Sequence, residues 1–174
     1  MRIVIVTNGI DAIFDYSINL ANSLSKFNEV FLINLSSKKR ATEYKELIDK
    51  KVNTSYLDFP RQRSPKNFVS TFSFHRLIKK INPHVIHLQV GYLWLTPSLF
   101  FFRKRIVLTI HDPILKIGSD QPFFSELTKN VSLTLASQII VHGKKLKETL
   151  LTNFNSNHSI VNVIPHGNFA HYKN

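Results

Sequence analysis

The chain contains no cysteine among its 174 residues. This absence excludes disulfide frameworks, cysteine nucleophiles and thiolate metal sites. Long apolar runs are missing too, because the longest, 90–102, is interrupted by Thr96-Pro97-Ser98 and is shorter than the roughly 20 residues that span a bilayer. The apolar run Ile3 to Val6 is too short for the core of a secretory signal. We therefore expect a single domain over residues 1–174 without a membrane-crossing segment.

Acidic residues are scarce, with 11 Asp and Glu against 23 Lys and Arg and a formal net charge of +12. The imbalance is local. Residues 1–60 hold 8 basic and 7 acidic side chains (+1), whereas residues 61–174 hold 15 and 4 (+11). A basic surface of this kind suits nucleic acid, phospholipid headgroups or a phosphorylated substrate. No recognisable nucleic-acid-binding motif accompanies the charge, so we expect no nucleic-acid partner.

Short β-branched runs alternate with longer segments of helical periodicity, which is typical of a parallel α/β domain. The predicted strands are Ile3–Thr7, Val30–Leu35, Thr54–Leu57, Val85–Gln89, Ile106–His111, Gln138–His142 and Ile160–Ile164. The predicted helices are Phe14–Lys26, Ala41–Lys51, Pro65–Ile81, Thr96–Arg103, Pro122–Leu135 and Lys144–Phe154. We expect a Rossmann-like three-layer α/β/α domain with a mainly parallel sheet of about seven strands.

Ligands of open parallel sheets bind beyond the carboxyl ends of the strands, which selects a set of candidate binding residues. The chosen positions are Asn8, Gly9, Asp11, Asp15, Gln89, Gly91, Asp112, His142 and His166. Four of the five glycines follow strands in this way, where backbone must turn tightly or approach a ligand closely. The Asn8-Gly9 turn is not followed by a dinucleotide or Walker pattern, so an ordinary strand-to-helix turn is the favoured interpretation there.

His111 is the candidate catalytic residue, because it closes a strand next to Asp112 and such a pair can orient a proton toward a bound hydroxyl. A structural hydrogen bond to a loop carbonyl is the competing interpretation. His84 and His87 flank the fourth strand and are expected to serve packing or supporting hydrogen bonds. No histidine pair has the spacing of a helical metal site and thiolates are lacking, so no metal is expected.

The segment 92–105 combines the only tryptophan, Trp94, with a Phe triplet and the basic triplet Arg103, Lys104 and Arg105. An interfacial helix has this composition. For the aromatic residues a buried helix is the favoured interpretation, and for the basic triplet an anionic lipid surface is favoured over a solvated helix C-terminus, where cations are also stabilising. Trp94 and the basic triplet are therefore the candidate membrane contacts, on an anionic surface.

Several stretches resemble the N-terminal domain of glycosyltransferase family 4, whose members have the two-domain GT-B fold. They are 12–24, with Ala12 where the family usually has Gly, then 83–89, 107–113, 136–146 and 163–168. The resemblance implies the acceptor-binding half of a retaining glycosyltransferase, with His111 facing the transferring sugar. It implies no tightly bound cofactor, a nucleotide-sugar as co-substrate, and a C-terminal donor-binding domain or subunit that residues 1–174 do not contain.

The resulting expectation is a cytoplasmic, peripherally membrane-bound hexosyl transferase for polysaccharide or cell-envelope synthesis, inactive without its donor-binding domain. Its acceptor would be a glycan or lipid-phosphate at the inner membrane face. The alternative is a lipid- or glycan-binding partner subunit without catalysis.

Overall fold

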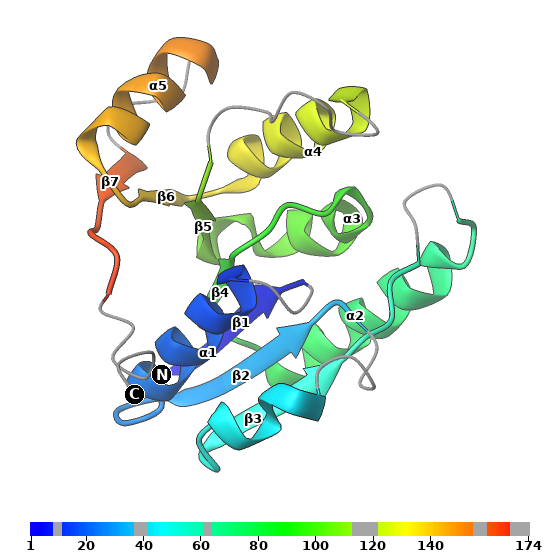
Figure 1. Ribbon diagram of the computed structural model, residues 1–174. Helices are drawn as coiled ribbons and strands as arrows, with labels where there is room; N and C mark the ends of the chain where they lie inside the picture. Colours follow the sequence, from blue (N-terminus) through cyan, green and yellow to red (C-terminus); the bar gives the residue numbers. More distant parts are fainter. Residues whose placement is uncertain (9–11, 37–41, 61–63, 113–121, 155–159, 168–174) are drawn as a thin grey trace.

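The computed structural model describes residues 1–8, 12–36, 42–60, 64–112, 122–154 and 160–167 (Figure 1). Seven strands form one sheet, in the order β3-β2-β1-β4-β5-β6-β7. The strands are β1 (Arg2–Thr7), β2 (Glu29–Asn34), β3 (Val52–Tyr56), β4 (Val85–Leu88), β5 (Ile106–Ile110), β6 (Gln138–Val141) and β7 (Val161–Val163). Every pairing is parallel. The predicted α/β fold and all seven predicted strands are confirmed.

Helices cover both faces of this sheet, and alternate residues of each central strand point to opposite layers. The helical elements are α1 (Ala12–Leu24), η1 (Thr42–Leu47), α2 (Asn67–Ile81), η2 (Leu93–Leu95), α3 (Thr96–Leu99), η3 (Phe100–Arg105), α4 (Pro122–Leu135) and α5 (Lys144–Phe154). In β1, Ile3 and Ile5 pack with α1, whereas Val4 and Val6 belong to the core beneath α2, α3, α4 and α5. The sheet therefore lies between two apolar layers.

Two predicted helices were wrong in extent. The segment predicted as Ala41–Lys51 forms only the short 3₁₀ turn η1, because Asp49 ends it. The Asp49 carboxylate accepts the Lys51 N–H at 2.9 Å, and the backbone carbonyl of Asp49 accepts the Val52 N–H at 2.9 Å. These two bonds turn the chain into β3.

The predicted helix Thr96–Arg103 is divided into α3 and η3, and η2 precedes it. Its 3₁₀ parts rise about 2.0 Å per residue, against 1.5 Å in an α-helix. The short connection thereby crosses from the end of β4 to the start of β5.

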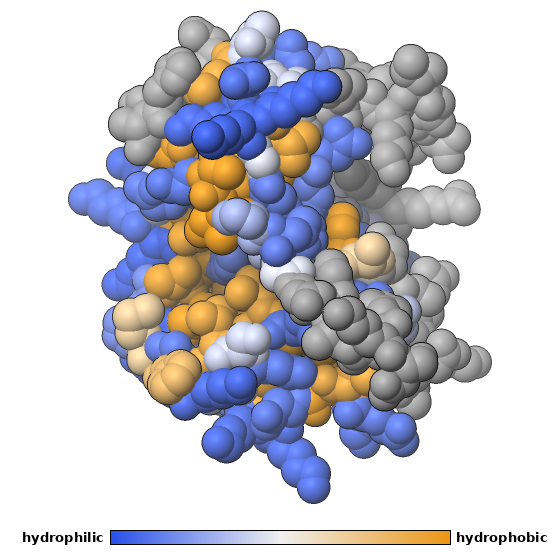
Figure 2. Space-filling model, turned by 60° about the vertical axis from the view of Figure 1, so that its left-hand side comes forward, coloured by the Kyte–Doolittle hydropathy of each residue, from blue (hydrophilic) through white to orange (hydrophobic). Residues whose placement is uncertain are grey.

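The surface mixes hydrophobic and hydrophilic groups. Figure 2 shows one face, on which hydrophobic side chains are visible in the middle with hydrophilic ones around them. Among the described residues, no helix is long and apolar enough to span a membrane.

Candidate active site

Three histidines from separate loops meet around one tyrosine at the carboxyl edge of the sheet. His111 follows β5, His142 follows β6 and His166 lies three residues beyond β7. Tyr16 reaches them from α1, with its ring centroid 5.3, 5.2 and 4.9 Å from those of the three imidazoles, each in an edge-to-face arrangement. The histidine rings are also neighbours, at 5.2 Å for His111 and His142 and 4.0 Å for His142 and His166. The parallel strands thus bring together residues that are far apart in the sequence.

A buried hydrogen-bond chain fixes the orientation of His111. The Oε1 of Gln89 lies 3.0 Å from Nε2 of His111, and the Nε2 of Gln89 lies 3.3 Å from Nε2 of His87. In this amide orientation the carbonyl oxygen accepts and the amide nitrogen donates. His111 therefore donates from Nε2, and His87 accepts at Nε2. Thr109 Oγ1 lies 2.7 Å from the same His87 nitrogen and hydrogen-bonds with it.

Burial determines the charge state of His87 in this hydrogen-bond chain. His87, Gln89 and Thr109 are all buried, and desolvation lowers the pKa of His87 to about 4, with further lowering from the positive charges of His111 and His142. Burial removes the water that stabilises an imidazolium ion. His87 is therefore neutral at pH 7 and serves as an acceptor.

His142 is held from the opposite side. Its Nδ1 donates to the carbonyl of Ile164 at 2.9 Å, so Nε2 carries the lone pair. That nitrogen is enclosed and has no hydrogen-bond partner within the described part of the chain. Burial, followed by the nearby charge of His142, lowers the pKa of His166, and burial raises the pKa of Tyr16. Both effects favour the neutral forms of His166 and Tyr16.

Each of the three imidazoles offers one ring nitrogen as a metal ligand, and these nitrogens all lie within 4.8 Å of one another. A metal ion could therefore be held between them. Neutral imidazole is a ligand that Zn²⁺, Cu²⁺ and Ni²⁺ all accept. The intervals of 31 and 24 residues between these histidines carry no metal-site signature in the sequence, which is why no metal was expected.

The remaining predicted binding residues are distributed around this cluster. Asn8 is exposed at the end of β1, Asp15 is half-buried on α1, and Asp112 is exposed beside His111. Gly9 and Asp11 lie outside the described residues. The carbonyl of Asp112 accepts a hydrogen bond from Lys129 Nζ at 3.3 Å.

Gly91 makes its close approach to helix α4. A Cβ at this position would lie 2.8 Å from Ser132 Oγ and 3.0 Å from Thr128 Cγ2. Separations this short leave no space for a side chain. Helix packing alone therefore accounts for the glycine.

The predicted membrane contacts lie outside the histidine cluster. Trp94 is half-buried, with its ring 4.8 Å from that of Phe68. Arg103, Lys104 and Arg105 are exposed, and Arg105 Nη1 donates to Asn82 Oδ1 at 3.1 Å and to the Pro83 carbonyl at 2.8 Å. This pair of bonds holds the end of α2, where Asn82 is left-handed with φ of 45°.

Sequence reasoning missed two participants. Tyr16 occupies the centre of the cluster, although a tyrosine near the start of a helix gives no signal by itself. Thr109 pairs with His87 across neighbouring strands, and the strand alternation predicts only that both point to the same face. The expected supporting roles of His84 and His87 agree with their contacts, since His84 Nδ1 accepts the Arg2 N–H at 3.0 Å.

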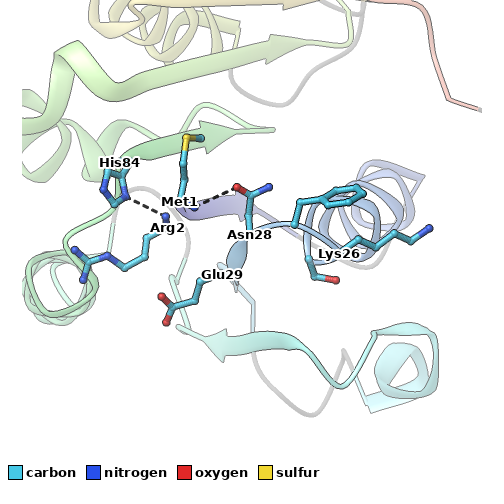
Figure 3. Close-up of a pocket in the computed structure, with 8 residues that line it drawn as sticks. Met1, Arg2, Lys26, Asn28, Glu29 and His84 are labelled. Atoms are coloured by element: carbon cyan, nitrogen blue, oxygen red, sulfur yellow. Dashed lines mark hydrogen bonds between the residues drawn. The ribbon is translucent and has the colours of Figure 1, made fainter.

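A separate depression lies at the amino edge of the sheet, away from the histidines. Figure 3 shows its lining, in which the terminal amine of Met1 donates to Asn28 Oδ1 at 3.3 Å and Arg2 N–H to His84. It is wide and shallow, and the amino ends of parallel strands are not where ligands of such sheets bind. We therefore place the candidate site at the histidine cluster.

The order of the parallel sheet is Rossmann-like and matches the N-terminal half of the GT-B fold. The family model for Glycosyltransferase Family 4 matches residues 15–167, so the chain belongs to glycosyltransferase family 4. The resemblance read from the sequence is thereby confirmed.

Solved structures share this fold at low identity. A glycosyltransferase from Rickettsia africae ESF-5 has a TM-score of 0.69 and 14% identity, over 98% of this chain and 44% of that one. Anabaena Alr3699/HepE in complex with UDP and glucose gives 0.65 and 13%, over 97% and 45%. The UDP-GlcNAc 2-epimerase from Methanocaldococcus jannaschii gives 0.64 and 14%, over 94% and 45%.

The chain thus spans less than half the length of the solved structures it resembles. A search of curated protein sequences finds no match.

Proposed function

We propose that this chain is the acceptor-side domain of a retaining glycosyltransferase that moves a hexosyl group from a nucleotide-sugar to a lipid-linked or polysaccharide acceptor. The observation that carries the proposal is the convergence of His111, His142 and His166 on Tyr16 at the carboxyl edge. Membership of glycosyltransferase family 4 supports it. The nucleotide-sugar is a co-substrate held by a C-terminal donor-binding domain or subunit.

In this proposal His111 contacts the transferring sugar or the acceptor hydroxyl. Its ring is held by the Gln89 bond and by the edge of Tyr16, so a hydroxyl that reaches His111 meets an imidazole already in place. A group with a fixed orientation loses little entropy when it binds, and this lowers the barrier of the step it assists.

The site is proposed to work beside an anionic membrane, with the protein peripheral on the cytoplasmic face. The net charge of +12 and the exposed Arg103 and Lys104 support this placement. A lipid-phosphate acceptor would be presented from that surface. Without the donor-binding domain we expect no transfer.

The test is sugar transfer by the chain joined to or mixed with a matching donor-binding domain. His111→Ala should lower kcat/KM by about tenfold to a hundredfold, the range for a lost hydrogen bond to a charged or developing-charge group. His84→Ala changes an exposed histidine at the amino edge and is the matched control. Equal transfer by the His111 variant and the wild type would contradict the role of His111. No transfer by the wild type beside a donor-binding domain would favour a non-catalytic glycan- or lipid-binding subunit.

A further inference from the structure

Helix α2 exposes aromatic side chains on its outer face. Phe68, Val69 and Phe72 are 68%, 71% and 62% exposed, while Phe74, Ile78 and Ile81 are buried against the sheet. The helix is therefore apolar on two sides over its first turns. A solvent-facing helix surface is ordinarily polar, and exposed aromatic clusters mark interaction sites.

The exposed face continues onto the neighbouring segment 93–105, which packs beside α2. Trp94 contacts Phe68 at a centroid distance of 4.8 Å, and Phe101 contacts His75 at 6.2 Å. Phe100 and Phe101 are 53% and 77% exposed. We call Phe68, Val69, Phe72, Trp94, Phe100 and Phe101 the aromatic surface.

Cations lie among these rings. Arg76 lies 5.9 Å from the Phe72 ring centroid and Arg103 lies 5.3 Å from that of Phe100. Between Phe59 and His111 the sequence has nine Lys and Arg and no Asp or Glu. A protein partner for such a surface would need to be uniformly acidic. An anionic bilayer satisfies both requirements together, because its headgroups pair with the cations and its interface accepts aromatic rings.

We propose that the aromatic surface is a membrane-insertion face that docks on anionic phospholipid, with the Phe68 and Phe72 rings entering the interface. Arg76, Lys79 and Lys80 continue along α2 on the exposed side and contact the phosphates. The N-terminus of α2 follows β3 and η2 follows β4, so Phe68 and Trp94 lie at the edge where the histidine cluster lies. Docking through this face brings the candidate site next to the bilayer.

The inference extends the proposed membrane placement by naming the side chains that insert, and its test needs no sugar transfer. Co-sedimentation of the full chain is measured with vesicles of phosphatidylcholine alone and of phosphatidylcholine with phosphatidylglycerol. Only the second should bind, and binding should fall as salt rises. The Phe68→Ser, Phe72→Ser double variant should bind at least about tenfold more weakly, since each ring loses apolar burial in the interface.

Phe27→Ser is the matched control, because Phe27 is 87% exposed but borders the depression at the amino edge. It should bind as the wild type does. Circular dichroism confirms that all variants fold. Equal binding by the double variant and the wild type would overturn the proposal. It would also be overturned if the wild-type chain did not bind anionic vesicles. If the wild type forms dimers in sedimentation and the double variant does not, while both bind vesicles equally, the surface is an interface between two copies and the proposal is wrong.

Transfer to a soluble acceptor separates this inference from the proposed function. The double variant leaves the histidine cluster intact, so in the presence of the donor-binding domain its transfer to a soluble acceptor should equal that of the wild type. Loss of vesicle binding with retained soluble transfer supports both proposals independently.

Discussion

At the scale of single residues, Gln89 decides which proton His111 carries. Its amide bridges His111 and His87 at 3.0 and 3.3 Å and is 2% exposed. Gln89→Leu removes the acceptor for the His111 Nε2 proton, while Gln89→Glu keeps an acceptor at the same place. Nitrogen-15 shifts of the His111 ring should report the Nε2–H tautomer in the wild type and in Gln89→Glu, and a mixture of tautomers in Gln89→Leu.

The same substitution should reduce transfer without affecting the overall fold. We expect Gln89→Leu to lower kcat more than it raises KM, because the ring still contacts substrate but in a wrong orientation. Gln89→Glu should restore part of kcat. An unchanged tautomer in Gln89→Leu would show that the loop, rather than Gln89, orients His111.

At the scale of elements, the packing of Gly91 against α4 controls how the β4 end meets that helix. Gly91→Ala places a methyl group 2.8 Å from Ser132 Oγ, and overpacking of this kind costs about 1–3 kcal/mol of unfolding free energy. Ser132→Ala removes the hydroxyl and should return part of that loss in the double variant. Urea unfolding of the four proteins measures the coupling. Additive effects of the two substitutions would show that the Ser132 hydroxyl is not the group that excludes a side chain at Gly91.

The strand elements were predictable because buried parallel strands leave a simple signature. The β-branched runs from Arg2–Thr7 to Val161–Val163 have few polar neighbours, and the carboxyl-end rule then brought His111, His142 and His166 to one edge. Segment 93–105 could not be predicted in the same way. In the sequence, the exposed Phe100 and Phe101 follow the same pattern as apolar residues of a buried helix. Sequence alone does not show which apolar face is covered.

Side-chain direction within the site was also beyond the sequence. The strand ends indicated His111 and Gln89 separately, but the bond between them depends on a register in which His87 pairs with Val107, two residues before Thr109. Tyr16 reaches the cluster from helix α1. Such contacts depend on how the sheet and its helices pack in three dimensions. The sheet edge that carries the site could therefore be predicted, and the hydrogen-bond chain could not.

At the scale of the whole molecule, burial of His87 couples the stability of the fold to pH. The pKa of His87 is about 4 in the folded chain, against 6.5 for ordinary histidine. Between these values the unfolded chain binds a proton that the folded chain does not, so stability falls as pH falls from 6.5 toward 4. One such group contributes a slope of at most about 1.4 kcal/mol per pH unit. The lowered pKa of His166 acts in the same direction.

A His87→Asn variant isolates this contribution, because the His166 effect persists in it. Its free energy of unfolding, measured by urea titration at several pH values between 6.5 and 4, should depend less steeply on pH than that of the wild type. The variant should also lose stability at pH 7, where the Thr109 hydroxyl and the Gln89 amide lose their buried partner. His84→Asn changes an exposed histidine outside the network and provides the control. Parallel pH curves for wild type and His87→Asn would mean that His87 takes up its proton while the chain is still folded, and the neutral acceptor assigned to it in the site would then be wrong.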